Sequence, residues 1–231
     1  MLLCVLLTAW LSRCTSAGSP PVQPAPHYQL QSMDPDCLHD EEILSNILSS
    51  YHKIKIPKLG MGVLVEVWII EVTYVSAEHE DIMLELYLNE MWSDPGLRYE
   101  HLNACNPRIV FDAAFAERIW IPQTAFLNTK SFSVHSTPYI NYMGILHPNG
   151  TVQTDTRIQL RAPCAFDLAR YPVDTVSCRL RIGSFKYSKA EIKLNFMPGT
   201  PVYTEAAISL QDYTPLNLTT SVELVVSSLF F

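Results

Sequence analysis

Six cysteines give this chain its clearest potential for covalent chemistry. Cys164 and Cys178 enclose thirteen residues, and the stretch Tyr171-Pro172-Val173-Asp174 lies between them. A disulfide between these two cysteines would remove about 3 kcal/mol of conformational freedom from the unfolded chain, because it closes a short loop. Such a bond requires an oxidising compartment, so the chemistry of the loop depends on where the chain resides.

The N-terminal residues 1–17 predict export from the cell. The stretch "MLLCVLLTAWLSRCTSA" is apolar and ends in small residues, although it lacks a basic start. It is too short to span about 30 Å of hydrocarbon, which favours a cleaved signal peptide over a membrane anchor; an uncleaved hydrophobic tail is the alternative. Cleavage leaves four cysteines, an even number that fits two disulfides. The sequons at Asn149 and Asn217 also predict an exported glycoprotein.

The sequence contains none of the common enzymatic motifs. Its seven histidines include no pair at i,i+4 spacing, and G-x-S-x-G, P-loop and dinucleotide-binding motifs are absent. We therefore expect no catalytic residue, no metal and no cofactor. The net charge of −7, with scattered basic residues, argues against nucleic-acid binding. No run of residues reaches the eighteen or so apolar positions of a membrane helix.

The sequence predicts a helix before residue 60 and strands after it, and these elements must position the candidate site residues. Residues 18–33 form a Pro-rich leader. The next segment predicts an amphipathic helix that is capped by Asp34-Pro35 or by Asp36 and is ended by Pro57 and Gly60. One face of this helix collects the apolar side chains of Ile43, Leu44, Ile47, Leu48 and Tyr51.

Beyond residue 60 the hydrophobic pattern has the period of two that is typical of strands. Three segments place apolar residues on one face, namely Val63, Val65, Val67 and Ile69; Ile82, Leu84, Leu86, Leu88 and Trp92; and Val152, Ile158 and Leu160. The first segment changes phase near Glu71, which predicts a bulge. The opposite face of the other two contains Met83, Glu85, Tyr87, Asn89, Gln153, Asp155, Arg157, Gln159 and Arg161. This pattern predicts an all-β fold, an immunoglobulin-like antiparallel β-sandwich with an N-terminal α-helix.

Several motifs together resemble the Cys-loop pentameric ligand-gated ion channels across most of residues 34–231. They are Cys-x13-Cys around Tyr-Pro-Val-Asp, W-x-D at residues 92–94, W-x-P at 120–122, "FLN" at 126–128, "NGT" at 149–151 and "GSFKY" at 183–187. The approach "RIQLRAPC" to Cys164 is more similar to the anion-selective branch that includes GABA- and glycine-type receptors. A true immunoglobulin domain is excluded, because its disulfide joins distant positions on opposite sheets.

The resemblance implies the extracellular domain of a ligand-gated chloride channel subunit at the synaptic plasma membrane. A small amine or amino-acid neurotransmitter would bind between subunits of a homo- or heteromeric pentamer. The implied ligand contacts come from one subunit face with Phe126, Ser184, Phe185 and Tyr187, and from an opposite face with Tyr87, Asn89, Gln153 and Asp155. Packing in the core is the alternative role for Phe185 and Tyr187.

The resemblance also implies a Cys164–Cys178 disulfide, which leaves Cys37 and Cys105 as the second pair. Within the closed loop, Tyr171, Pro172 and Asp174 would couple ligand binding to the membrane part of the channel. A plain structural role is the alternative for this loop.

Three positions depart from the family pattern: Ala165 replaces a proline, Gln123 replaces an aspartate and Ala125 replaces an aromatic residue.

The family's four transmembrane helices would follow Phe231. We therefore interpret residues 34–231 as a C-terminally incomplete ligand-binding domain that meets the membrane only through segments outside this chain. A chain that truly ended there would be secreted and would carry no current by itself. The alternatives are a secreted, pore-less transmitter-binding protein of the same fold and an adhesion-type β-sandwich.

Overall fold

The computed structural model describes residues 36–170 and 174–204, together with residues 213 and 219. The predicted signal peptide (1–17), the Pro-rich leader (18–33), Tyr171, Pro172 and Asn217 lie outside the described residues. These predictions, and the domain boundaries drawn with them, stay predictions.

The N-terminal helix α1 (Asp40–Ser49) presents its apolar side to the core, as predicted. Ile43 and Ile47 are buried, and Leu44 and Leu48 pack against the same core cluster. Within the described residues, no helix is long and apolar enough to cross a membrane.

Both predicted ends of this helix were wrong. His39 is the N-cap, and its backbone N–H donates to Glu42 Oε2 at 3.3 Å, so neither Asp34 nor Asp36 caps the helix. Leu38, directly before His39, instead forms a bridge with Ala104, and its backbone N–H donates to the carbonyl of Asn103 at 2.7 Å. The helix ends at Ser49, well before Pro57 and Gly60.

Tyr51 leaves the helical path because its hydroxyl joins two distant motifs. The hydroxyl donates to Asp94 Oδ2 at 2.6 Å and accepts a hydrogen bond from the backbone N–H of Trp120 at 3.0 Å. Asp94 Oδ1 accepts from Gly96 N at 2.9 Å and thereby caps the short helix η1 (Pro95–Leu97). The W-x-D and W-x-P motifs thus meet through one tyrosine, and the rings of Trp92 and Trp120 pack edge to face at 6.0 Å between centroids.

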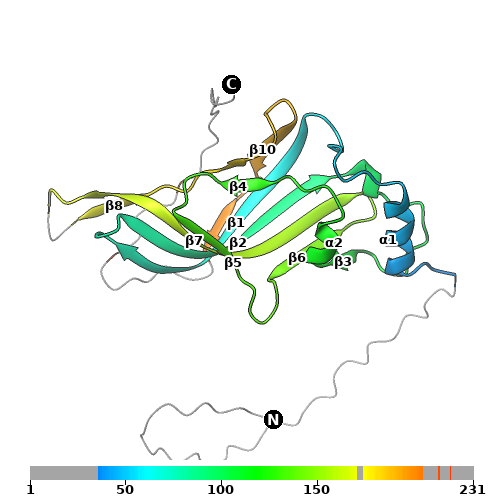
Figure 1. Cartoon of the computed structure of the whole chain (residues 1–231), viewed down its shortest axis with the longest axis horizontal. Coiled ribbons are helices and arrows are strands. Elements are labelled where there is room, and N and C mark those ends of the chain that lie inside the picture. The colour runs from blue at the N-terminus through cyan, green and yellow to red at the C-terminus, as the bar shows by residue number, and fades with distance from the viewer. Residues whose placement is uncertain (1–35, 171–173, 205–212, 214–218, 220–231) are drawn as a thin grey trace, which may run out of the picture. The chain divides into compact units, whose positions relative to one another are not determined.

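Three long strands form the centre of a nine-stranded sheet (Figure 1). They are β1 (Met61–Ser76), β2 (Asp81–Ser93) and β7 (Thr151–Asp167), in the spatial order β10-β1-β2-β7-β6-β3. Shorter strands complete this order, namely β3 (Ile109–Phe111), β6 (Tyr142–Leu146) and β10 (Ile192–Phe196). The strands β5 (Ser131–Val134) and β8 (Thr175–Cys178) also pair with β7, and β11 (Val202–Thr204) pairs with β1.

A separate two-stranded antiparallel sheet consists of β4 (Thr124–Phe126) and β9 (Ile182–Ser184). The short helix α2 (Ala113–Ala116) follows β3. The all-β sandwich with an N-terminal helix is therefore confirmed. Most ladders are antiparallel, but β10 and β11 pair with β1 in parallel, which the sequence pattern did not indicate.

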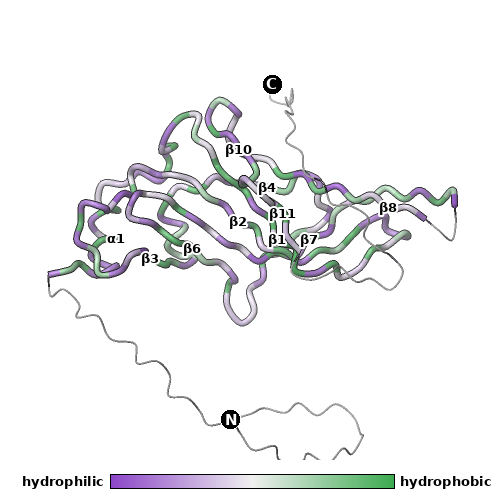
Figure 2. The backbone as a smooth tube through the Cα atoms, turned by 180° about the vertical axis from the view of Figure 1, so that it is seen from behind, coloured by the Kyte–Doolittle hydropathy of each residue, from purple (hydrophilic) through white to green (hydrophobic). Residues whose placement is uncertain are grey.

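The predicted alternation along the strands matches the burial of their side chains. The buried residues include Val63, Val65, Val67, Ile69, Leu84, Leu86, Leu88, Trp92, Val152, Ile158 and Leu160. Hydrophobic and hydrophilic positions occur along the same strands (Figure 2). The register between β1 and β2 shifts between Ile69 and Glu71, which confirms the bulge predicted near Glu71. Because the inner face is filled in this way, the polar residues between these positions are directed outward.

The long strands separate two regions of the fold. The helix α1 lies near one end of them, and the hairpin of β7 and β8 lies at the other (Figure 1).

The turn "HPNG" before β7 requires a glycine at position 150. Gly150 has a φ of 80°, and a Cβ there would lie 2.4 Å from the carbonyl oxygen of Asp94.

Candidate functional site

Four of the predicted ligand residues lie together on the outward side of the β2–β7 pair. Tyr87 and Asn89 belong to β2, and Gln153 and Asp155 belong to the neighbouring strand β7. The register places Asn89 directly opposite Asp155, and all four side chains are half-buried. Strand pairing therefore brings together residues that are more than sixty positions apart in the sequence.

Two residues of β1 extend this group, and the sequence analysis missed them. Trp68 lies opposite Tyr87, with 6.0 Å between the ring centroids, and Glu66 lies opposite Asn89. Asn89 Nδ2 donates to Glu66 Oε2 at 2.9 Å. Alternation could have identified both, because Val63, Val65 and Val67 face inward and leave residues 66 and 68 outward. We call Glu66, Trp68, Tyr87, Asn89, Gln153 and Asp155 the Tyr87 face.

The Tyr87 face is acidic at its centre. Burial raises the pKa of Asp155; a hydrogen bond with Gln153 opposes this shift, and the negative charge of Glu66 adds to it. Within the described residues, Asp155 Oδ1 has no hydrogen-bond partner. The neighbouring cation Arg157 is paired with Glu85, with 2.8 Å between Arg157 Nη2 and Glu85 Oε2.

The remaining predicted ligand residues lie along the small sheet, with Phe126 at one end and Ser184 and Phe185 at the other. Strand pairing sets Thr124 opposite Ser184 and Phe126 opposite Ile182. Phe185 follows β9 and is 78% exposed, which disfavours the core alternative for this residue. Phe126 is half-buried and packs against the core, with its ring centroid 6.1 Å from that of Phe132. We call Phe126, Ser184 and Phe185 the Phe185 face.

Two of the positions that depart from the family pattern support the Phe185 face through their backbones. Gln123 has a φ of 55°, and its carbonyl accepts a hydrogen bond from the backbone N–H of Phe185 at 3.3 Å. Ala125 lies opposite Gly183 in the small sheet. Backbone pairing at these two positions therefore holds the segment 183–185 in place, although neither residue matches the family motif.

Tyr187 is tied to the core more than to the surface. Its hydroxyl accepts a hydrogen bond from Trp120 Nε1 at 2.9 Å, and the two rings lie 5.6 Å apart. Its backbone N–H donates to Ser184 Oγ at 3.0 Å. Lys186 lies over the same ring, with its Nζ 5.3 Å from the centroid. These contacts favour the packing alternative for Tyr187.

Asn128, in the "FLN" motif, fixes the chain that leads into β9. Its Nδ2 donates to the carbonyl of Arg179 at 2.6 Å, and its Oδ1 accepts from the backbone N–H of Arg181 at 2.8 Å. The backbone N–H of Leu127 donates to the carbonyl of Arg181 at 2.8 Å. The segment after β4 is therefore bonded to the segment that connects the Cys178 hairpin with Phe185.

Both expected disulfides are present in the structure. Cys164 and Cys178 lie opposite each other in the β7–β8 hairpin, and Cys37 is bonded to Cys105. Of the residues expected to couple the loop to the membrane part, Tyr171 and Pro172 lie outside the described residues, and Asp174 is half-buried. Leu168, near the tip of the described hairpin, is 55% exposed.

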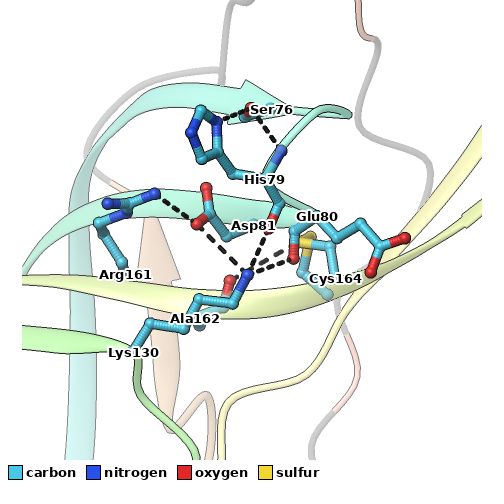
Figure 3. Close-up of polar contacts among 9 residues, drawn as sticks. Ser76, His79, Glu80, Asp81, Lys130, Arg161, Ala162 and Cys164 are labelled. Carbon is cyan, nitrogen blue, oxygen red and sulfur yellow. Dashed lines mark hydrogen bonds and ion pairs between the residues drawn. A yellow bond between two sulfur atoms is a disulfide. The ribbon is translucent and has the colours of Figure 1, made fainter.

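A buried carboxylate connects the β1–β2 turn to the base of this hairpin (Figure 3). The side chain of Asp81 is fully buried, and its Oδ2 lies 2.6 Å from Arg161 Nη2 and 3.5 Å from Lys130 Nζ. Lys130 also donates to the carbonyls of His79 and Glu80, and the Glu80 carbonyl accepts from the backbone N–H of Cys164 at 3.0 Å.

We call Asp81, Lys130 and Arg161 the Asp81 cluster. The charges of Lys130 and Arg161 determine whether Asp81 is protonated. Burial alone raises its pKa, but the hydrogen bonds and positive charges of Arg161 and Lys130 outweigh burial and hold the pKa below its usual range. Asp81 is therefore ionised at neutral pH, and it links three segments that meet beside Cys164. Sequence analysis missed this cluster, because nothing in the local pattern pairs residues 81, 130 and 161.

Of the two predicted glycosylation sites, only Asn149 lies within the described residues. Its side chain is exposed in the turn before β7, and its Oδ1 accepts from the backbone N–H of Thr151 at 2.9 Å. This geometry leaves room for a glycan at Asn149, and the modification stays a prediction.

The chain thus folds into a β-sandwich whose β7–β8 hairpin is closed by a disulfide. The family model of the neurotransmitter-gated ion-channel ligand binding domain matches residues 40–228. The chain therefore belongs to this family of ligand-gated ion channels, which are not enzymes.

Relatives with similar sequences support the expected branch of the family. The acetylcholine-gated chloride channel subunit acc-1 of Caenorhabditis elegans is 38% identical over 188 residues, which are 81% of this chain and 40% of that protein. The γ-aminobutyric acid receptor subunit theta of Mus musculus is 27% identical over 94% of this chain and 36% of its own length. The serotonin-gated chloride channel mod-1 of C. elegans is 29% identical over 79% and 37%, respectively. The resemblance to the anion-selective branch is thus confirmed, and the chain spans less than half of each of these relatives.

Proposed function

We propose that this chain binds a small neurotransmitter between two neighbouring subunits of a ligand-gated chloride channel. Its family membership and the names of its relatives support a transmitter-binding role. In this proposal the domain lies on the extracellular side of the plasma membrane, at a synapse. The ligand contacts the Phe185 face of one subunit and the Tyr87 face of the next.

One observation carries the part of this proposal that concerns the subunit interface. The Tyr87 face lies on the outward side of the nine-stranded sheet, whereas the residues of the Phe185 face belong to the separate β4–β9 sheet or directly follow it. Within the described residues, no hydrogen bond or ring contact joins the two faces. A ligand that needs aromatic and polar contacts from both is therefore best placed between two copies of the chain.

The β7–β8 hairpin is proposed to transmit the binding event to the membrane part. It lies at the end of the long strands away from α1, and it is closed by Cys164–Cys178. The Asp81 cluster holds the adjacent β1–β2 turn against its base, so the two segments move together. Exposed Leu168 then supplies an apolar contact for the membrane part.

Replacing Phe185 by alanine is expected to weaken agonist binding about thirtyfold. The expected cause is the loss of a desolvated cation–π contact, which contributes about 2 kcal/mol. Because Phe185 is 78% exposed, its removal leaves the fold intact, which circular dichroism can check. The measurement is a titration of the assembled protein with agonist.

Tyr139→Ala is the matched control, since Tyr139 is also an exposed aromatic residue, at 81%, but lies on the β5–β6 connection outside both faces. Its affinity should equal that of the unmodified protein. An unchanged affinity in Phe185→Ala would remove Phe185 from the ligand site.

A further inference from the structure

The Tyr87 face combines aromatic rings with negative charge. Trp68 is 40% exposed and packs beside Tyr87, so two neighbouring rings border the acidic centre of this face. Phe185 would add a third ring from the neighbouring subunit. Rings of this kind attract a cation through their negative faces, and they offer nothing comparable to an anion.

Two carboxylates lie in one row across the strands of this face. The register aligns Glu66 on β1, Asn89 on β2 and Asp155 on β7. Asn89 donates a hydrogen bond to Glu66, but an amide carries no charge that could offset either acid. Within residues 36–170 and 174–204, neither Glu66 nor Asp155 has an ion-pair partner.

The cations along β7 on this side of the sheet are already paired with other acids. Arg157 contacts Glu85, and Arg161 and Lys130 both contact Asp81. Near the Phe185 face, Lys186 places its ammonium group over the ring of Tyr187. A ligand carboxylate would therefore approach two carboxylates, whereas a ligand ammonium group would find charges of opposite sign.

We propose that the ligand of this site is a cation without a carboxylate, and that Glu66 and Asp155 supply the negative charge that recognises its ammonium group. This inference rests on the proposed function, since it assigns the chemical class of the ligand that binds between the two faces. It distinguishes an amine or quaternary ammonium transmitter from a zwitterionic amino acid.

Calorimetric titration of the assembled full chain with two pairs of probes tests this assignment. Acetylcholine and serotonin are cations without a carboxylate, and glycine and γ-aminobutyric acid are zwitterions. We expect heat of binding from at least one cation and none from the zwitterions. Glu66→Gln and Asp155→Asn keep the size of each side chain and remove its charge, and each should weaken binding of the cation about fivefold.

Lys186→Gln is the matched control. Lys186 directly follows Phe185 in the sequence, so its removal would weaken binding of a zwitterion whose carboxylate pairs with it, and it should leave binding of the cation unchanged. Binding of a zwitterion that depends on Lys186 would overturn the inference and leave the proposed function standing. Equal binding of the cation by Glu66→Gln, Asp155→Asn and the unmodified chain would also overturn it. The absence of binding by all four probes would overturn the proposed function itself.

Discussion

Replacing Cys37 and Cys105 together by serine is expected to lower the free energy of unfolding by about 4 kcal/mol. This bond closes a loop with a sequence separation of 68, which contains α1, β1 and β2. Opening this disulfide increases the conformational entropy of the unfolded chain, and this increase grows with the logarithm of loop length. Denaturant unfolding of the purified, disulfide-bonded protein measures the loss.

The paired replacement of Cys164 and Cys178 is the matched comparison. Its sequence separation is only 14, so the expected loss is about 3 kcal/mol. Replacing both cysteines of each pair avoids a free thiol. A larger loss from the short loop than from the long one would contradict the loop-entropy argument, and it would show that Cys164–Cys178 mainly stabilises contacts of the native hairpin.

Asp94→Ala is expected to destabilise the fold by about 3 kcal/mol. The carboxyl group of Asp94 is almost completely buried, and it accepts hydrogen bonds from the Tyr51 hydroxyl and the Gly96 backbone N–H. Alanine leaves both donors without this acceptor, and each buried unsatisfied group costs about 1–3 kcal/mol. Chemical denaturation at pH 7 gives the difference directly.

Asp94→Asn provides the control and a test of pH dependence. Burial raises the pKa of Asp94, and its hydrogen bonds from Tyr51 and Gly96 only partly oppose this shift. The raised pKa means that the contribution of Asp94 is greatest at low pH and is lost as the pH rises through the folded-state value. Asparagine keeps an acceptor and has no charge, so Asp94→Asn should cost less than Asp94→Ala and should remove this dependence. Equal destabilisation by both variants at every pH would contradict the account.

The strands were predictable from the sequence because their burial is periodic. Val63, Val65 and Val67 alternate with outward residues, and the sheet needs no other information to decide which side faces the core. The bulge near Glu71 could be predicted for the same reason, because the apolar positions change phase there. The ends of α1 could not be predicted from the local sequence. The N-terminal end depends on the backbone hydrogen bond from Leu38 to Asn103, and the C-terminal end on the Tyr51–Asp94 contact, and both join distant parts of the chain.

The candidate site shows the same division. Alternation and the family resemblance indicated Tyr87, Asn89, Gln153 and Asp155, and strand register brings them together. Trp68 and Glu66 come from a third strand. Alternation alone could have placed them on the outward side, but only the pairing of β1 with β2 shows that they lie beside Tyr87 and Asn89. Arg161 and Asp81 lie 80 positions apart in the sequence and meet through their side chains. No local pattern encodes such contacts, which is why sequence analysis missed them.

A ligand that lies between two subunits can be tested most directly by mixing two defective chains. Phe185→Ala and Tyr87→Ala each remove one face, so each variant alone should bind agonist weakly. In a mixed assembly, purified through two different tags, about a quarter of the interfaces would combine an intact Phe185 face with an intact Tyr87 face. We predict that the mixture regains about a quarter of the normal binding sites at normal affinity. Binding in the mixture no better than in either variant alone would contradict a site shared between subunits.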